Sequence, residues 1–177
     1  MILTQENSLV LIIDIQEKLL NAVFNKDTLT KKAKILVESA QKLGLPVLIT
    51  EQYPQGLGST IADLSSNAQI YTKTKFNALS DEKLYEDLRR LNKQQIIVMG
   101  IETHICVYQT VCALLEKGFE VSVVKDACGS RAEFEYRSAL DIMKDKGAEI
   151  KTTEMILFEI LKEASHPKFK EIQHLIK

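Results

Sequence analysis

The chain alternates short apolar, β-rich runs with stretches of helical spacing, and this alternation constrains its fold more than any other feature. The run Leu9–Ile15 is almost continuously apolar, which is typical of a strand covered on both faces. In Thr28–Leu43, apolar residues recur three and four positions apart, which predicts a helix that ends at Gly44. Strands of this kind separated by helices indicate a parallel sheet between two layers of helices.

The same alternation continues along the chain. Further strands are predicted at Val47–Thr50, Ile70–Thr72, Gln95–Met99, Glu120–Val124 and Glu149–Lys151. Helices are predicted at Glu82–Leu91 and His104–Lys117. A third helix is predicted to begin at a capping box of Ser130 and Glu133 and to run through Lys146, and two short helices follow the last strand. We therefore expect an α/β fold with a parallel six-stranded sheet.

Charge and composition argue against several classes of protein. The net charge is −1 and the sequence pI is about 6.3, which gives no electrostatic footprint for nucleic acid or an anionic membrane. No apolar run approaches the ~20 residues that a membrane-spanning helix needs. The segment MILTQENS lacks the pattern of a secretory signal, and the three cysteines form an odd count. We expect a cytoplasmic protein of one domain, spanning residues 1–177, whose cysteines are thiols.

Two reactive side chains are predicted to meet near the centre of the sheet. In a doubly wound sheet of order 3-2-1-4-5-6, the first and fourth strands are neighbours, and ligands bind beyond their carboxyl ends. Asp14 ends the first strand, and Cys106 follows the fourth by one short turn. Alone, Asp14 is as consistent with a helix cap or a solvated strand end, and Cys106 with core packing. Their expected proximity favours a functional site.

The turn around Cys106 suits a nucleophile. Gly100 ends the strand, and Thr103 is predicted to cap the following helix, which places Cys106 at the third helical position. There the helix dipole and free N–H groups favour a thiolate, and the same N–H groups can hold an oxyanion. The other cysteines, Cys112 and Cys128, are expected to pack in the core.

Three motifs occur in the order and approximate spacing of one known family. Asp14 lies in DIQ, Lys75 in KTKFNA and Cys106 in GIETHICV, and nearly the whole chain resembles the isochorismatase-like cysteine hydrolases. The stretches TEQYPQGLGST and HPKFKEIQHLIK resemble the subgroup called isochorismatase domain-containing proteins. Nothing in the spacing alone selects Lys75, and Lys73 beside it is expected to be solvated.

The resemblance implies a fold and a mechanism. It implies a three-layer α/β/α sandwich of Rossmann-like strand order, an Asp14–Lys75–Cys106 triad and a cis peptide bond between Ile101 and Glu102. Cys106 would attack a carboxamide or ureido carbon, Asp14 would move the proton, and the N–H groups of Glu102 and Cys106 would hold the oxyanion. A thioester intermediate would follow. The candidate substrate-binding residues are Gln16, Gln52, Tyr53, Phe76, Ile101 and His104.

Metal and cofactors are not expected. Nicotinamidases of this family carry an Asp-x-His metal motif after the second strand, where this chain has Glu51–Gln52–Tyr53. The three histidines show no ligand spacing, and no GxGxxG motif follows the first strand. Members that resemble true isochorismatases lack the cysteine, so Cys106 favours C–N hydrolysis over cleavage of a vinyl ether.

Three classes of function stay open. The leading hypothesis is a metal-independent cysteine hydrolase that acts on a small molecule. The alternatives are a thiol-based redox or electrophile-reactive protein and a non-catalytic binding protein on a hydrolase fold. The resemblance also implies a homo-oligomer, for which the apolar side of the C-terminal helix around Ile172 is a candidate contact, unless that helix packs on its own chain. For His104, the alternative to substrate binding is a hydrogen bond across a subunit contact.

Overall fold

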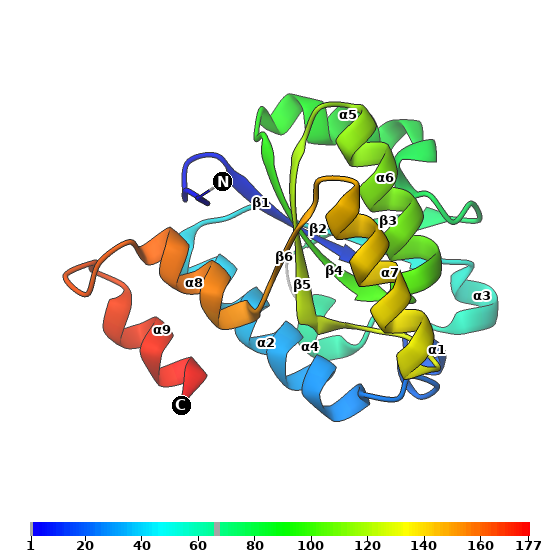
Figure 1. Cartoon of the computed structure of the whole chain (residues 1–177), viewed down its shortest axis with the longest axis horizontal. Coiled ribbons are helices and arrows are strands. Elements are labelled where there is room, and N and C mark those ends of the chain that lie inside the picture. The colour runs from blue at the N-terminus through cyan, green and yellow to red at the C-terminus, as the bar shows by residue number, and fades with distance from the viewer. Residues whose placement is uncertain (1, 66–67) are drawn as a thin grey trace.

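The computed structural model describes residues 2–65 and 68–177 (Figure 1). Its centre is a parallel six-stranded sheet in the order β3-β2-β1-β4-β5-β6, which confirms the predicted strand order. The strands are β1 (Ser8–Ile13), β2 (Val47–Gln52), β3 (Gln69–Lys73), β4 (Gln95–Ile101), β5 (Glu120–Gly129) and β6 (Glu149–Lys151). All six residues of β1 and all seven of β4 are buried, as expected of strands covered on both faces.

Two layers of helices enclose the sheet, which confirms the expected sandwich. The longer helices are α2 (Lys26–Leu43), α5 (Glu82–Leu91), α6 (Tyr108–Glu116), α7 (Glu133–Asp145), α8 (Thr153–Leu161) and α9 (Phe169–Ile176). Figure 1 shows α5, α6 and α7 on one side of the sheet and α2 and α8 on the other. The short segments are α1 (Glu17–Leu20), α3 (Pro54–Leu57), α4 (Ala62–Ser65), the 3-10 turn η1 (Ala78–Ser80) and the π-helical turn η2 (Thr103–Val107).

The strand register brings the ends of three strands together. Ile13 at the end of β1 pairs with Thr50 of β2 and with Gly100 of β4. Gly100 has φ 152°, and a Cβ atom there would lie 2.2 Å from the carbonyl oxygen of Ile13. The close approach of β4 to β1 therefore requires glycine at this position. The residues that follow these strands emerge side by side.

The loop after β5 differs from the prediction. The strand continues to Gly129, well beyond the predicted Val124. The Ser130–Glu133 capping box is wrong, because Ala132 is the N-cap residue of α7 and makes no side-chain cap. Ser130 is instead buried, and its hydroxyl lies 3.0 Å from Nδ1 of His104.

The C-terminal helix packs on its own chain. Ile172 of α9 is fully buried, and α9 contacts α2 and α8. Of the two alternatives for the apolar side of this helix, the structure therefore shows intramolecular packing for Ile172. Across the described ranges 2–65 and 68–177, no helix has the length and apolarity that crossing a membrane requires.

Candidate active site

Asp14 is buried at the carboxyl end of β1 and is neither a helix cap nor solvated. Its side chain is fully enclosed, and its backbone adopts a left-handed conformation with φ 52°. One carboxylate oxygen, Oδ1, accepts a hydrogen bond from the Thr50 hydroxyl at 2.7 Å. The other, Oδ2, accepts from Nζ of Lys73, also at 2.7 Å. The acid thus lies in a buried ion pair at the predicted switch point.

The lysine of this ion pair is Lys73, and the predicted placement of Lys75 is wrong. In β3, Tyr71 and Lys73 are buried while Thr72 is exposed, so the two-residue alternation of the strand turns Lys73 inward. Its side chain is only 3% exposed. Lys75 lies beyond the end of the strand and is exposed, and it contributes its carbonyl oxygen to Lys73 at 3.2 Å. The predicted strand ended at Thr72, one residue before Lys73, so its alternation did not include Lys73.

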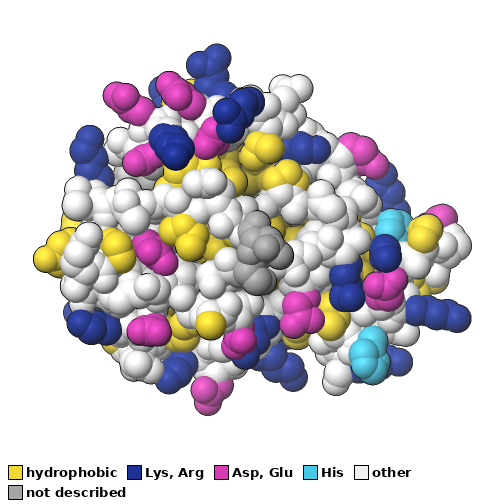
Figure 2. All heavy atoms as spheres, turned by 180° about the vertical axis from the view of Figure 1, so that it is seen from behind, with side chains coloured by type: hydrophobic (Ala, Val, Ile, Leu, Met, Phe, Trp, Pro, Cys, Tyr) yellow, Lys and Arg dark blue, Asp and Glu magenta, His cyan; other side chains and the backbone are white. Residues whose placement is uncertain are grey.

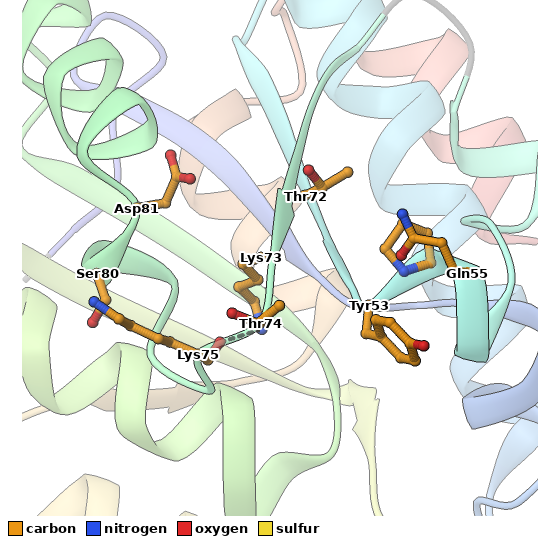
Figure 3. Close-up of a pocket in the computed structure, with 9 residues that line it drawn as sticks. Tyr53, Gln55, Thr72, Lys73, Thr74, Lys75, Ser80 and Asp81 are labelled. Carbon is orange, nitrogen blue, oxygen red and sulfur yellow. Dashed lines mark hydrogen bonds between the residues drawn. The ribbon is translucent and has the colours of Figure 1, made fainter.

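Figure 3 shows the two lysines pointing in different directions. The side chain of Lys75 extends toward Ser80, away from Tyr53, while a dashed line joins Lys73 to the Lys75 carbonyl. The pocket drawn there has a volume of about 290 Å³ and lies along β3 at the edge of the sheet. Its lining includes Lys73 but neither Asp14 nor Cys106.

Cys106 lies in η2 beside the ion pair, as its predicted position required. Cys106 is 6% exposed, and its thiol lies close enough to the Asp14 carboxylate and to Lys73 for both to shift its pKa. Burial raises the pKa of the Cys106 thiol to about 12; the charge of Asp14 adds to the rise, and the ammonium of Lys73 opposes it. The raised pKa favours the neutral thiol at neutral pH, and it opposes the bias toward thiolate that the helix dipole was expected to give.

The turn that carries Cys106 is not capped by Thr103. Glu102 is the N-cap residue and makes no side-chain cap, Thr103 is the first residue of η2, and Cys106 is its fourth. The Thr103 hydroxyl is buried and has no hydrogen-bond partner among the described residues. The peptide bond between Ile101 and Glu102 is cis.

Contacts with the loop after β5 fix this turn. The carboxylate of Glu102 accepts hydrogen bonds from the backbone N–H and from Nε of Arg131, at 3.1 and 2.9 Å. His104 is half-buried and contacts Ser130, which is an intramolecular role for its ring. Ile101, the last residue of β4, is fully buried, so its side chain belongs to the core.

Both glutamines predicted to bind substrate are engaged with the protein. Nε2 of Gln16 donates to the carbonyl groups of Gln52 and Gly58, at 3.0 and 2.6 Å, and its Oε1 accepts the Gln52 N–H at 2.7 Å. Gln16 is also fully buried, and these hydrogen bonds hold the loop after β2 in place; a substrate contact of Gln16 stays a prediction. Oε1 of Gln52 accepts from Lys73 at 2.7 Å, and its Nε2 donates to the carbonyl of Thr74.

Two aromatic side chains near the ion pair are exposed. Tyr53 is 55% and Phe76 51% exposed. The backbone N–H of Tyr53 donates to the carbonyl of Lys73 at 2.9 Å, and the carbonyl of Phe76 lies 3.4 Å from Nζ of Lys73. Both residues can therefore contact a molecule that approaches the ion pair from solvent.

The carboxylate of Glu51, near the end of β2, is engaged with the backbone of the following loop. Glu51 is buried, and its carboxylate accepts the backbone N–H of Thr60 at 2.7 Å. Among the residues that the structure describes, no group of three or more His, Cys, Asp or Glu side chains is arranged to hold a metal ion.

The other two cysteines lie apart from the ion pair. Cys128 is fully buried in β5, which agrees with the predicted packing role, and burial raises its pKa to about 12. Cys112 is half-buried on α6.

The sequence analysis did not predict a role for Lys73 or Thr50. The signal that points to them is the spacing of two residues along a strand, which pairs Thr50 with Gln52 in β2 and Tyr71 with Lys73 in β3.

Comparisons with known proteins agree with the fold. The family model of the isochorismatase domain matches residues 8–155. Isochorismatase domain-containing protein 2 of Xenopus laevis is 39% identical over 176 residues, which is 98% of this chain and 85% of the relative. Isochorismatase domain-containing protein 2B of Mus musculus is 37% identical over 97% of this chain and 82% of the relative.

Solved structures give the same result. The MAR1 ribonuclease of Caenorhabditis elegans superposes with a TM-score of 0.93 at 36% identity, over 99% of this chain and 92% of that one. YcaC of Pseudomonas aeruginosa, solved with covalent acrylamide, gives a TM-score of 0.93 at 25% identity, over 98% and 91%. The Escherichia coli YcaC product, an octameric hydrolase of unknown specificity, gives 0.90 at 25% identity, over 99% and 94%. With relatives of this identity along nearly its whole length, the chain belongs to the isochorismatase family and has the fold of that family's hydrolases.

Proposed function

We propose that this protein is a metal-independent cysteine hydrolase that cleaves a C–N bond of a small amide or ureido compound. The observation that carries the proposal is the buried Lys73–Asp14 ion pair, 2.7 Å long, with the Cys106 thiol close enough for both charges to shift its pKa. An acid, a cation and a nucleophile enclosed at one point provide general base catalysis and covalent catalysis together.

The neutral thiol determines how the first step runs. Because the pKa of Cys106 is raised to about 12, the sulfur reaches the carbonyl carbon as its proton passes to the Asp14 carboxylate. The carbonyl oxygen becomes an oxyanion, held by the backbone N–H groups of Glu102 and Cys106. Lys73 keeps its charge beside Asp14 and offsets the negative charge that develops on the sulfur.

The second half of the reaction reverses the proton transfer. The tetrahedral intermediate collapses, the C–N bond breaks, and the leaving nitrogen takes the proton from Asp14, which leaves a thioester on Cys106. Asp14 then removes a proton from water as the water attacks the thioester carbon, and the departing thiolate regains that proton. The products are an acid and ammonia or an amine, and the enzyme is restored.

The relatives support a reactive nucleophile on a hydrolase fold. A structure of Pseudomonas YcaC carries covalent acrylamide, an electrophile that adds to nucleophiles through its vinyl carbon, and the Escherichia coli relative is described as a hydrolase of unknown specificity. The exposed side chains of Tyr53 and Phe76 are the candidate contacts for the substrate. Nucleic acid as a substrate gains no support from charge: the net charge is −1, and Figure 2 shows acidic and basic side chains interspersed on the face it displays.

The two alternatives predict different behaviour. A redox thiol reacts through its thiolate, which the raised pKa of Cys106 disfavours at neutral pH. A non-catalytic binding protein would retain the fold without any turnover.

We further propose that the chain forms a homo-oligomer in the cytoplasm, in line with the octameric Escherichia coli relative. Light scattering coupled to size-exclusion chromatography tests the oligomeric state.

Ammonia release from a panel of small amides and ureido acids tests the proposed function. We expect release from at least one compound by the wild-type protein and none by Cys106→Ala. Lys73→Met should abolish release, whereas Lys75→Met, which alters the exposed lysine two residues away, should retain it. A panel without any release, or release that survives Cys106→Ala, would overturn the proposal.

A further inference from the structure

We propose that Thr50 and Gln52 of β2 are positioning residues, which hold the carboxylate of Asp14 and the ammonium of Lys73 in the orientation that Cys106 needs. This inference rests on the proposed function and adds two residues to it. Neither residue would touch the reacting atoms, because Thr50 contacts Asp14 and Gln52 contacts Lys73.

The geometry of β2 places both side chains on the same side. Residues two apart in a strand point in the same direction, and Thr50 and Gln52 are two apart at the carboxyl end of β2. β2 and β3 flank each other, and β1, which ends before Asp14, lies on the other side of β2. One strand therefore presents a hydroxyl to the acid and a carbonyl oxygen to the cation.

Thr50 holds Asp14 at two points. Its carbonyl oxygen accepts the backbone N–H of Asp14 at 3.1 Å, and its hydroxyl donates to Oδ1 at 2.7 Å. Thr50 is fully buried, so water does not compete for this hydrogen bond. With Oδ2 bonded to Lys73, each carboxylate oxygen has one fixed donor, and the carboxylate cannot rotate freely. The lone pair left for the Cys106 proton then has a fixed direction.

Gln52 fixes the direction of the ammonium. The backbone N–H of Gln52 is held by Gln16 at 2.7 Å, and its Nε2 is held by the carbonyl of Thr74 at 2.7 Å. Its Oε1 is thereby aimed at Nζ of Lys73, 2.7 Å away. Nζ has three N–H donors, and its two short contacts are those to Asp14 and Gln52, while the backbone carbonyls of Lys75 and Phe76 lie at 3.2 and 3.4 Å.

Core packing alone does not require a hydroxyl at position 50. Valine has the same shape as threonine and is favoured in a buried strand, so a site chosen for packing would accept it. The variants Thr50→Val and Thr50→Ser separate the two explanations, because the first keeps the shape and the second keeps the hydroxyl. Gln52→Met similarly keeps the length of the side chain and removes its oxygen.

The rate at which iodoacetamide alkylates Cys106, followed residue by residue with mass spectrometry from pH 6 to 9, tests this inference without a known substrate. When Asp14 takes the proton, the rate is independent of pH over this range; when free thiolate reacts, it rises about tenfold per pH unit below the thiol pKa. We expect a pH-independent rate in the wild-type protein that Thr50→Val and Gln52→Met lower by about 10- to 100-fold. Thr50→Ser should restore most of it. Cys112 on the same chain is the internal control: at each pH, its alkylation rate should be the same in the variants as in the wild-type protein.

The outcomes distinguish this inference from the proposed function. A wild-type rate that already rises tenfold per pH unit would overturn the role of Asp14 as base, and with it both proposals. A pH-independent rate that Thr50→Val leaves intact, or that Thr50→Ser fails to restore, would overturn the positioning role alone. If thermal melting shows that Thr50→Val does not fold, the other two variants decide. A loss of alkylation rate in Thr50→Ser as large as that in Gln52→Met would overturn the role of the Thr50 hydroxyl. A wild-type alkylation rate in Gln52→Met would overturn the role of Gln52.

Discussion

At the residue scale, Asp14 and Lys73 form a pair whose members depend on each other. Asp14 is fully buried and Lys73 nearly so, and burying a charge without a partner costs several kcal/mol. The same pair controls the state of Cys106, because Asp14 raises the pKa of the thiol and Lys73 lowers it. Each member can therefore be tested by its effect on the others.

Asp14→Asn should separate the reactivity of the thiol from hydrolysis. Removing the carboxylate removes one cause of the raised pKa of Cys106 and leaves the cation of Lys73 in place, so the pKa of the thiol should fall from about 12. Alkylation of Cys106 should then run through the free thiolate and rise about tenfold per pH unit between pH 6 and 9, while ammonia release is lost because no base remains. An alkylation rate that stays independent of pH in Asp14→Asn would contradict this, as would a variant that still hydrolyses amides.

Lys73→Met should destabilise the protein far more than Lys75→Met. The first change leaves the Asp14 carboxylate buried without its cation, which typically costs about 3–5 kcal/mol, whereas exposed substitutions change stability by about 0.5 kcal/mol or less. The free energy of unfolding from guanidinium titrations measures both. Similar values for the two variants would show that Lys73 does not balance a buried charge.

The same residues show which parts of the site can be predicted from the sequence. The proximity of Asp14 and Cys106 was predicted correctly because the strand order brings them together, and that order follows from the alternation of elements. The lysine was misplaced by two positions because the family resemblance alone selected Lys75, and a strand boundary one residue too early hides that Lys73 points inward. The engagement of Gln16 with backbone groups depends on the loop after β2, whose path no local pattern specifies.

At the element scale, the site depends on how closely β4 approaches β1. Gly100 permits that approach, and the turn from Ile101 to Cys106 starts there. The strands were predictable because buried strands have a strong apolar pattern. The four-residue helices α1, α3 and α4 were missed because they are too short for a periodic pattern, and the π-helical turn has no sequence signature that separates it from an α-helix.

Gly100→Ala should disrupt the site through the strands. A Cβ atom at position 100 would lie 2.2 Å from a backbone oxygen of Ile13, so β1 and β4 must move apart, at a cost of roughly 1–3 kcal/mol or more. Gly118→Ala is the matched control: Gly118 also has a positive φ, of 84°, but apart from its chain neighbours no atom of the described residues lies within 4 Å of its Cβ position. We expect Gly100→Ala to lose more stability and to slow Cys106 alkylation. Equal melting temperatures would contradict the close-approach argument.

At the scale of the whole molecule, four buried or partly buried acids should make the protein sensitive to alkali. Burial raises the pKa of Cys106 and Cys128 from an ordinary 9.0 to about 12, and that of Tyr71 and Tyr136 from 10.0 to still higher values. Above pH 9 the unfolded chain loses these protons first, so the folded state binds more protons and its stability falls as the pH rises.

Guanidinium unfolding at pH 8 and at pH 10.5 measures this loss. The contribution of these groups is fully present below pH 9, and it is lost progressively toward pH 12. The free energy of unfolding should therefore be lower at pH 10.5, and the loss should shrink in Cys106→Ala. An unchanged or higher value at pH 10.5 would show that these groups are not protected from ionisation by the fold.

The most direct test of the central claim is the mass of the Cys106 peptide when a turning-over reaction is quenched with acid. With an amide that the wild-type protein hydrolyses, the account predicts an adduct on Cys106 whose mass equals that of the acyl group, present in the wild-type protein and absent in Cys106→Ala. Ammonia release at full rate without any acyl adduct on Cys106, or with the adduct on another residue, would contradict it.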